Sequence, residues 1–254
     1  MDLVYRLAIA ASRLLFWLLG LRIRVDGAEH IPRSGPAIVV SNHVSFLDFI
    51  FVGLAARPSG RFIRFLTRYD VWHNAIAGPA MTAMRHVPVD RAAPAGAFLE
   101  ARGALIAGAL VGVFPEAGIS RSFTVRALMP GAVALSRSTG APLVLVAVWG
   151  PQRVATAGLP ISLRRGRAVS IAVSPPITLP TQGCVQDATV ELGRQLQQLV
   201  TGVQQSHPDQ PGPGCPDDRH PAHLGGTAPT ACDAAVEADV PRRAVHPPDA
   251  AAMF

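Results

Sequence analysis

Residues 39–48 have the sequence VVSNHVSFLD and join two apolar segments of different kinds. The segment before the polar residues, 37–40, is short and rich in β-branched side chains, which is typical of a buried strand. The segment after them, 49–56, is longer and favours a helix. Asn42 and His43 therefore lie at a strand-to-helix junction, where α/β proteins often carry functional side chains.

The spacing between His43 and Asp48 restricts how their side chains can meet. Five positions along a helix turn the chain by about 500°, which leaves the two side chains about 140° apart. They can meet only if His43 lies in the junction loop and Asp48 in the first helical turn. Ser45 supports this arrangement, because Ser-x-x-Asp before an apolar segment resembles a capping box. The same pattern also allows a purely structural role, with Asp48 as a helix cap and His43 as a hydrogen-bonded junction histidine.

The composition is apolar and basic. Hydrophobic residues make up 49% of the chain, the mean hydropathy is +0.29 and the sequence pI is about 10.4. Every basic side chain other than histidine is an arginine, with 20 arginines against 10 acidic residues in 1–205 and 3 against 7 in 206–254. A basic body attracts anionic lipid, phosphorylated small molecules or nucleic acid, and guanidinium groups suit bidentate contact with phosphate.

Residues 3–21 form an apolar segment interrupted by Arg6 and Arg13, which a spacing of seven places on one helical face. Its longest uncharged stretch is well short of the about 20 residues that a membrane-spanning helix needs. We expect a helix in the membrane interface, with Phe16 and Trp17 toward the lipid and the arginines toward the headgroups. The alternatives are a buried first helix and a signal peptide, and the absence of a convincing small-residue cleavage site disfavours the second.

Strand-like and helix-like segments alternate after this first helix. The expected strands are 21–25, 37–40, 61–66, 86–89, 110–114, 142–148 and 168–173, and the expected helices are 46–57, 72–84, 94–109 and 187–205. This alternation predicts an α/β fold with a mostly parallel central sheet flanked by helices. Pro, Gly, Asp and Ala dominate the end of the chain, which predicts disorder there. The expected organisation is an interface helix over 1–21, a single domain over 22–205 and a disordered tail over 206–254.

Two further polar groups follow predicted strands, as His43 does. Arg91 comes after the fourth strand, and Glu116, Gly118 and Arg121 come after the fifth. A glycine permits a sharply turned backbone, and the N–H groups, hydroxyl groups and arginine that follow it can bind an anion. Each group also has an ordinary explanation: a surface ion pair for Arg91, and for Glu116 a strand-end carboxylate held by a helix N-terminus or an arginine.

Several kinds of site are not supported by any motif. HExxH, the Walker loop, GxGxxG after a strand and GxSxG are all missing from the sequence, so it predicts no metal and no cofactor. The cysteines at 184, 215 and 232 are odd in number and lack metal-like spacing, which indicates a reducing compartment and no disulfide framework.

The motifs in order are Asn-His-x4-Asp, Asp-Arg, Phe-Pro-Glu-x-Gly with Ser-Arg-Ser, and an apolar strand led by Ala-Pro. This set resembles the glycerolipid acyltransferase family over roughly residues 20–180, in particular the 1-acyl-sn-glycerol-3-phosphate (lysophosphatidate) acyltransferases. The resemblance implies that His43 is the general base and that Asp48 orients its ring. It also implies that Arg91, Glu116 and Gly118 hold the glycerol phosphate, and we add Arg121 because of its charge.

The resemblance further implies transfer of an acyl group from acyl-CoA or acyl-carrier protein to lysophosphatidic acid. The product is phosphatidic acid, and the expected location is the cytoplasmic face of the cell membrane, as a peripheral or monotopic protein. The third motif departs from the usual Phe-Pro-Glu-Gly-Thr-Arg-Ser, which leaves a lyso-ornithine lipid or another lysophospholipid open as acceptor. A non-catalytic binder of anionic membranes is the alternative of another class, whereas a nucleic-acid partner is disfavoured because no recognition motif is present.

Overall fold

The computed structural model describes residues 2–212, 216–236 and 244–245 of the chain. Its strands are β1 (Arg22–Asp26), β2 (Ala37–Ser41), β3 (Ile63–Arg68), β4 (Val87–Val89), β5 (Leu110–Val113), β6 (Leu143–Trp149) and β7 (Ala168–Val173). Its α-helices are α1 (Asp2–Leu18), α2 (Asp48–Ala55), α3 (Ala77–Ala83), α4 (Pro94–Ile106), α5 (Gly131–Thr139), α6 (Val185–Ser206) and α7 (Ala231–Val236). Strands and helices alternate along most of the chain, as the sequence predicts.

The strands form one seven-stranded sheet in the order β1-β7-β6-β2-β5-β3-β4. Every neighbouring pair is parallel except β6 and β7, which are antiparallel. The prediction of an α/β fold with a mostly parallel sheet is therefore confirmed. All five residues of β2 are buried, and β2 lies between β5 and β6. The carboxyl ends of these three strands share one edge of the sheet, which is the edge where His43 follows β2.

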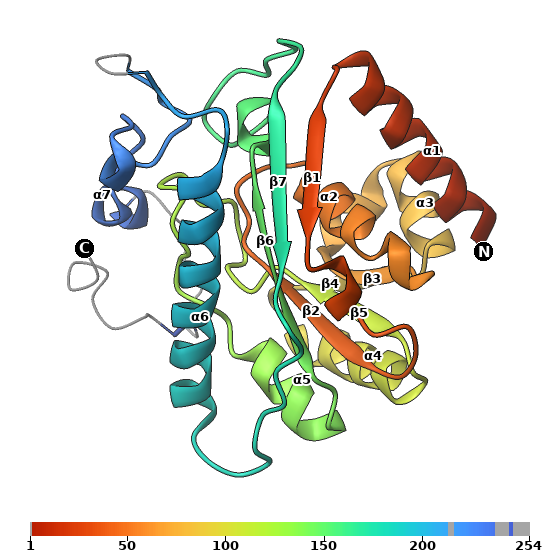
Figure 1. Cartoon of the computed structure of the whole chain (residues 1–254). Helices are drawn as coiled ribbons and strands as arrows, with labels where there is room; N and C mark the ends of the chain where they lie inside the picture. Colours follow the sequence, from red (N-terminus) through yellow and green to blue (C-terminus); the bar gives the residue numbers. More distant parts are fainter. Residues whose placement is uncertain (1, 213–215, 237–243, 246–254) are drawn as a thin grey trace.

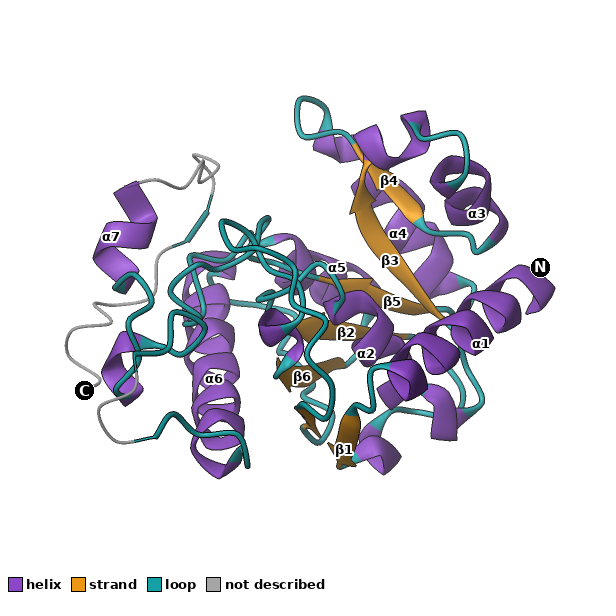
Figure 2. Ribbon diagram, turned by 90° about the horizontal axis from the view of Figure 1, so that it is seen from above, coloured by secondary structure: helices purple, strands orange, loops and turns teal. Residues whose placement is uncertain are grey.

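Helices cover both faces of the sheet (Figures 1 and 2). On one face, α4, α5 and α6 bury aliphatic side chains such as Leu105, Leu135 and Leu196 against the strands. On the other face, α1 and α2 enclose a second core that contains Phe16 and Phe51. Burial of apolar side chains on both faces explains why β2 and β6 are almost continuously apolar rather than alternating.

The first helix differs in part from the sequence prediction. Phe16 is 3% exposed and stacks on Phe51 with ring centroids 4.5 Å apart, so the prediction that it faces lipid is wrong. Its neighbour Trp17 is 72% exposed, together with several leucines of the same helix. Within the described part of the chain, no helix has both the length and the apolar character required to cross a bilayer.

Two helical segments also differ from the sequence prediction. The helix predicted over 72–84 is split into a short 3-10 helix, Tyr69–His73, and α3. The side chain of Asn74 explains the break, because its Oδ1 accepts hydrogen bonds from the N–H groups of Ile76 and Ala77. Helix α5 was not predicted, because its sequence begins with Gly131 and ends in Ser and Thr, all weak helix formers.

The described residues after α6 fold back onto the domain. His207 and His220 are buried beside Trp149, with ring centroids 6.5 and 6.1 Å from the indole. An ion pair of 2.8 Å between Arg153 and Asp217 joins the same regions. The prediction of a disordered tail is therefore not confirmed for residues 207–212 and 216–236. For residues 213–215, 237–243 and 246–254 it lies outside the described residues.

Candidate active site

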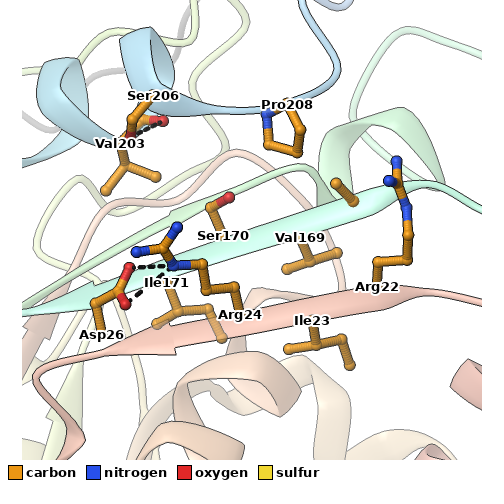
Figure 3. A pocket seen from close by; sticks show the side chains of 11 residues that line it. Arg22, Ile23, Arg24, Asp26, Val169, Ser170, Ile171, Val203, Ser206 and Pro208 are labelled. Atoms are coloured by element: carbon orange, nitrogen blue, oxygen red, sulfur yellow. Dashed lines mark hydrogen bonds and ion pairs between the residues drawn. The ribbon is translucent and has the colours of Figure 1, made fainter.

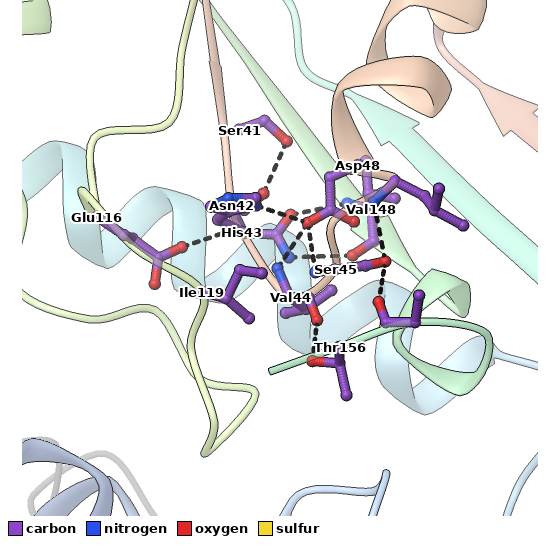
Figure 4. Close-up of polar contacts among 12 residues, drawn as sticks. Ser41, Asn42, His43, Val44, Ser45, Asp48, Glu116, Ile119, Val148 and Thr156 are labelled. Atoms are coloured by element: carbon purple, nitrogen blue, oxygen red, sulfur yellow. Dashed lines mark hydrogen bonds and ion pairs between the residues drawn. The ribbon is translucent and has the colours of Figure 1, made fainter. Parts of the chain in front are cut away.

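His43 and Asp48 meet at the carboxyl edge of the sheet (Figure 4). His43 lies in the loop after β2, and Asp48 is the first residue of α2, as their spacing requires. His43 Nδ1 lies 3.0 Å from Asp48 Oδ2, and the same oxygen accepts the N–H groups of Val44 and Ser45 at 2.7 Å each. One carboxylate oxygen therefore fixes both the imidazole and the loop that carries it.

The two side chains of this pair differ in burial. The Asp48 side chain is fully buried, whereas that of His43 is 23% exposed. Burial raises the pKa of Asp48, and the hydrogen bonds and charge of His43 oppose that rise. Because Nδ1 donates to Asp48, Nε2 carries the lone pair that can accept a proton. Phe114 stacks on the imidazole at 4.5 Å and restricts its rotation.

Glu116 holds the loop of His43 from the opposite side. Its side chain is buried, its Oε1 accepts the His43 N–H at 2.8 Å and its Oε2 accepts the Arg126 N–H at 2.9 Å. Burial raises the pKa of this carboxyl group to about 7, against the opposing effect of the two backbone donors. Both oxygens are occupied by backbone groups, so Glu116 positions His43 and Arg126 and has no carboxylate oxygen open to a ligand.

A second loop supports the first one. Asn42 exchanges two hydrogen bonds with the backbone of Val148 on β6, at 2.8 and 3.0 Å. In the loop after β6, Thr156 donates to the carbonyl of Val44 at 2.7 Å, and Ser45 donates to the carbonyl of Ala155. The Ser45 hydroxyl also accepts the N–H of Leu47, the N-cap residue of α2, at 3.1 Å, so it contacts the start of the helix without being its N-cap. No sequence motif indicated the loop after β6.

Arg91 and Gly118 lie near His43, and Arg126 joins them. The Arg91 guanidinium donates to the carbonyl of Ala117. A Cβ atom placed on Gly118 would lie 2.9 Å from Arg126 Nη1, so the Arg126 guanidinium covers this glycine. Two guanidinium groups therefore flank residues 117–118. The sequence did not indicate Arg126, because it lies outside the motif and reaches the site only through contacts that the fold creates with Glu116, Gly118 and Ile119.

Arg121 is placed on the other side of the motif. Its guanidinium packs against Gly158, where an added Cβ would lie 3.2 Å from Nε. The shifted spacing of Ser-Arg-Ser in this sequence explains the difference, because Ala117 at φ 54° and Gly118 add a turn before the arginine. The structure thus brings together His43, Asp48, Glu116, Arg91 and Gly118, and it places the Arg121 guanidinium against Gly158 in the loop after β6.

Among the described residues, no group of three or more His, Cys, Asp or Glu side chains is placed to hold an ion. The arrangement can instead remove a proton from a hydroxyl group, since it presents an oriented imidazole, a buried carboxylate and nearby cations.

The comparison with known families agrees with this geometry. A model of the acyltransferase family matches residues 22–149, which is half of the chain. The chain belongs to the acyltransferase family. The resemblance to 1-acyl-sn-glycerol-3-phosphate acyltransferases is confirmed, because named relatives of this acyltransferase chain carry that description.

Two relatives and one solved structure show how far the similarity extends. The chloroplast 1-acyl-sn-glycerol-3-phosphate acyltransferase of Arabidopsis thaliana is 30% identical over 160 residues, covering 61% of this chain and 44% of the relative. The 1-acyl-sn-glycerol-3-phosphate acyltransferase of Borreliella burgdorferi is 26% identical over 144 residues, covering 55% and 56%. The chain thus spans about half the length of the curated relatives it matches. The crystal structure of the 1-acyl-sn-glycerophosphate acyltransferase of Thermotoga maritima has the same fold, with a TM-score of 0.63 over 76% of both chains and 22% identity.

Proposed function

We propose that the protein transfers a fatty acyl group from acyl-CoA or acyl-carrier protein to the free hydroxyl of lysophosphatidic acid. The contact between His43 and Asp48 carries this proposal, because it leaves Nε2 as the base at the carboxyl edge of the sheet. Membership of the acyltransferase family and the descriptions of the named relatives support the same reaction.

The proposed chemistry needs one base and no covalent enzyme intermediate. His43 Nε2 accepts the proton of the acceptor hydroxyl while the hydroxyl oxygen attacks the thioester carbonyl. The carbon–sulfur bond then breaks, and the imidazolium returns the proton to the leaving thiolate. Asp48 stabilises the imidazolium between these steps. The products are the lipid ester, which is phosphatidic acid for this acceptor, and the free thiol of the carrier.

The phosphate of the acceptor requires cations close to His43. Arg91 and Arg126 lie beside residues 117–118, and Glu116 holds Arg126 and His43 through their backbone N–H groups. We assign the phosphate to these two guanidinium groups and to the backbone at Gly118. Arg121, packed against Gly158, would contact another part of the substrates.

Access to a lipid acceptor requires a membrane-facing surface, and α1 offers one. Leu3, Leu7, Leu14, Trp17 and Leu18 are all exposed on this helix. An amphipathic helix of this kind lies in the interface with its apolar side chains among the lipids. We propose a peripheral or monotopic position at the cytoplasmic face of the cell membrane.

The test is incubation of the protein with labelled acyl-CoA and a panel of lysolipids in detergent, with identification of the labelled product. We expect labelled phosphatidic acid from lysophosphatidic acid, and its loss in His43→Ala but not in His73→Ala, an exposed histidine. If only lyso-ornithine lipid or another lysophospholipid is labelled, the acyl transfer is supported but the acceptor is a different lipid. Consumption of no thioester, combined with vesicle binding, would favour a non-catalytic membrane binder.

A further inference from the structure

A cavity of about 550 Å³ lies away from His43, at the end of the molecule formed by β3, β4, α3 and α4. Arg64 of β3 and Arg85, which precedes β4, both line it. Trp72 and Pro88 supply apolar walls, and Glu100 of α4 lines the same space. The mechanism proposed above uses none of these residues.

The two arginines of this cavity have no partner within the described part of the chain. Neither guanidinium makes an ion pair or a hydrogen bond there. Burial lowers the pKa of Arg64, and the charge of nearby Arg85 lowers it further. Two cations held near each other, neither of them in an ion pair, repel each other, and a bound anion would offset this repulsion.

A second cavity, of about 350 Å³, shows the usual arrangement for comparison (Figure 3). It lies between β1, β7 and the end of α6, and Arg22 and Arg24 also line it. There Arg22 pairs with Asp209 at 2.8 Å and Arg24 pairs with Asp26 at 2.9 Å. The arginines of this cavity are already neutralised, so the missing partners distinguish Arg64 and Arg85.

The backbone at Arg85, which lines the cavity, has a left-handed conformation. Arg85 has φ 58° directly after α3, and the N–H of His86 bonds to the carbonyl of Met81. This left-handed position after a helix is one that glycine usually occupies. Placing an arginine there costs about 1 kcal/mol. An arginine at such a position indicates a use for its side chain.

The cavity lies at the same end of the molecule as the first turns of α1. The ring of the buried Tyr5 lies 5.9 Å from the ring of His86, which lines the cavity. Leu3 and Leu7 are exposed on the side of α1 opposite Tyr5, and Ile76 next to α3 is exposed as well. The N-terminal end of α1, α3 and β4 lie at the same end of the molecule (Figure 2). A charged cavity and exposed apolar side chains therefore occur at one end of the molecule.

We propose that this cavity binds the phosphate of an anionic phospholipid headgroup while exposed apolar side chains at the same end of the molecule, Ile76 among them, contact the acyl region. The guanidinium groups of Arg64 and Arg85 bind the phosphate oxygens, and the indole of Trp72 packs beside the headgroup. The charges of Arg64, Arg85 and Glu100 sum to one positive charge. This charge suits a phosphodiester, which carries one negative charge, better than a phosphomonoester. This inference rests on the proposed membrane association, not on the acyl-transfer step.

The test measures binding to vesicles of phosphatidylcholine alone and of phosphatidylcholine with phosphatidylglycerol. The variant is Arg64→Gln with Arg85→Asn, since asparagine tolerates a left-handed backbone. We expect its affinity for the mixed vesicles to fall roughly ten- to thirtyfold, from the loss of two basic contacts. Arg137→Ala with Arg194→Ala removes the same charge from α5 and α6, and we expect a change below about twofold, since a basic residue contributes only near the membrane surface.

Equal losses in the two double variants would overturn the proposal, as would an equal loss of affinity for the neutral vesicles. Failure of the unchanged protein to bind either kind of vesicle would also overturn it. Coenzyme A and inorganic phosphate, added at matched ionic strength, test for a soluble occupant, and release by either would assign the cavity to that molecule instead. If thermal unfolding shows Arg64→Gln with Arg85→Asn to be unfolded, Arg85→Asn alone replaces it, and its affinity for the mixed vesicles should fall roughly fivefold, from the loss of one basic contact. Acyl transfer in detergent is measured separately, so its failure is distinct from the failure of this inference.

Discussion

Asp48 Oδ2 accepts three hydrogen bonds, from the imidazole of His43 and from two backbone N–H groups, whereas Oδ1 has no partner among the described residues. This asymmetry means that an amide could keep the geometry, with its oxygen at the position of Oδ2 and its NH₂ group at that of Oδ1. The charge and the geometry of Asp48 can therefore be separated by experiment.

Asp48→Asn should lower kcat by roughly 10²- to 10⁴-fold while the fold is retained, because the imidazolium loses its counter-charge. The measurement is acyl transfer in detergent together with circular dichroism. The double variant with His43→Ala should be no slower than His43→Ala alone, since the two residues act as a unit. Additive losses would show that Asp48 does not act through His43.

Glu116→Gln should lower the free energy of unfolding by roughly 1–3 kcal/mol, since an amide can satisfy only one of the two backbone N–H groups. The effect should depend on pH, because the pKa of Glu116 is raised from 4.5 to about 7 in the folded state. The folded state then binds the proton more tightly, so this contribution to stability is full below pH 4.5 and is lost as the pH rises through 7. Urea unfolding should show that the difference in unfolding free energy between the unchanged protein and Glu116→Gln grows as the pH is lowered. A difference that does not change with pH would contradict this prediction.

At the scale of elements, the central strands were predictable because β2, β5 and β6 are short apolar segments, and they place their polar successors at one edge. Helix geometry gave the one arrangement in which His43 and Asp48 can meet, and the structure has it. The supporting loop after β6 was not predictable, since its contacts with Val44 and Ser45 are separated by more than 100 residues. The partners of Glu116 were not predictable either, because they are backbone N–H groups that any residue could supply.

Thr156→Val should test that loop. The substitution keeps the volume but leaves the carbonyl of Val44 without its donor, which we expect to cost about 1–3 kcal/mol of stability. Displacement of the adjacent His43 should lower kcat roughly tenfold. Thr139→Val is the control, because its hydroxyl donates to Leu135 within α5 at 2.7 Å, away from the site. Equal effects on kcat in the two variants would exclude a positioning role for the loop.

Substitutions of two adjacent residues of α1 should have different effects, one on stability and the other on membrane binding. Phe16→Ala should cost about 3–5 kcal/mol of unfolding free energy, since it removes a buried ring stacked on Phe51. Trp17→Ala should change stability by less than about 0.5 kcal/mol, because Trp17 is exposed. Vesicle sedimentation should show weaker binding for Trp17→Ala, and unchanged binding would mean that α1 does not contact lipid.

At the scale of the whole molecule, the described residues after α6 close the domain. Composition alone suggested disorder after residue 206, because proline, glycine and polar residues show no apolar period. The described residues are held by single contacts instead: Asp209 accepts hydrogen bonds from Arg22 and from the N–H of Ala168, and Asp217 forms an ion pair with Arg153. Such contacts leave no periodic pattern in the sequence.

A chain that ends at Ser206 should therefore be less stable and respond differently to pH. Trp149 is fully buried and His207 and His220 pack against it, so truncation should shift its fluorescence emission toward that of exposed indole. Burial lowers the pKa of His207 to about 4 and also lowers that of His220. Both are neutral in the folded state, so the full chain should lose stability as the pH falls from about 6.5 toward 4, where the unfolded state binds more protons. Urea unfolding across this range should show a smaller loss for the truncated chain and, with the chain kept full, for His207→Gln. If the unfolding free energies of all three proteins fall by the same amount over this pH range, the buried histidines do not cause the loss of stability.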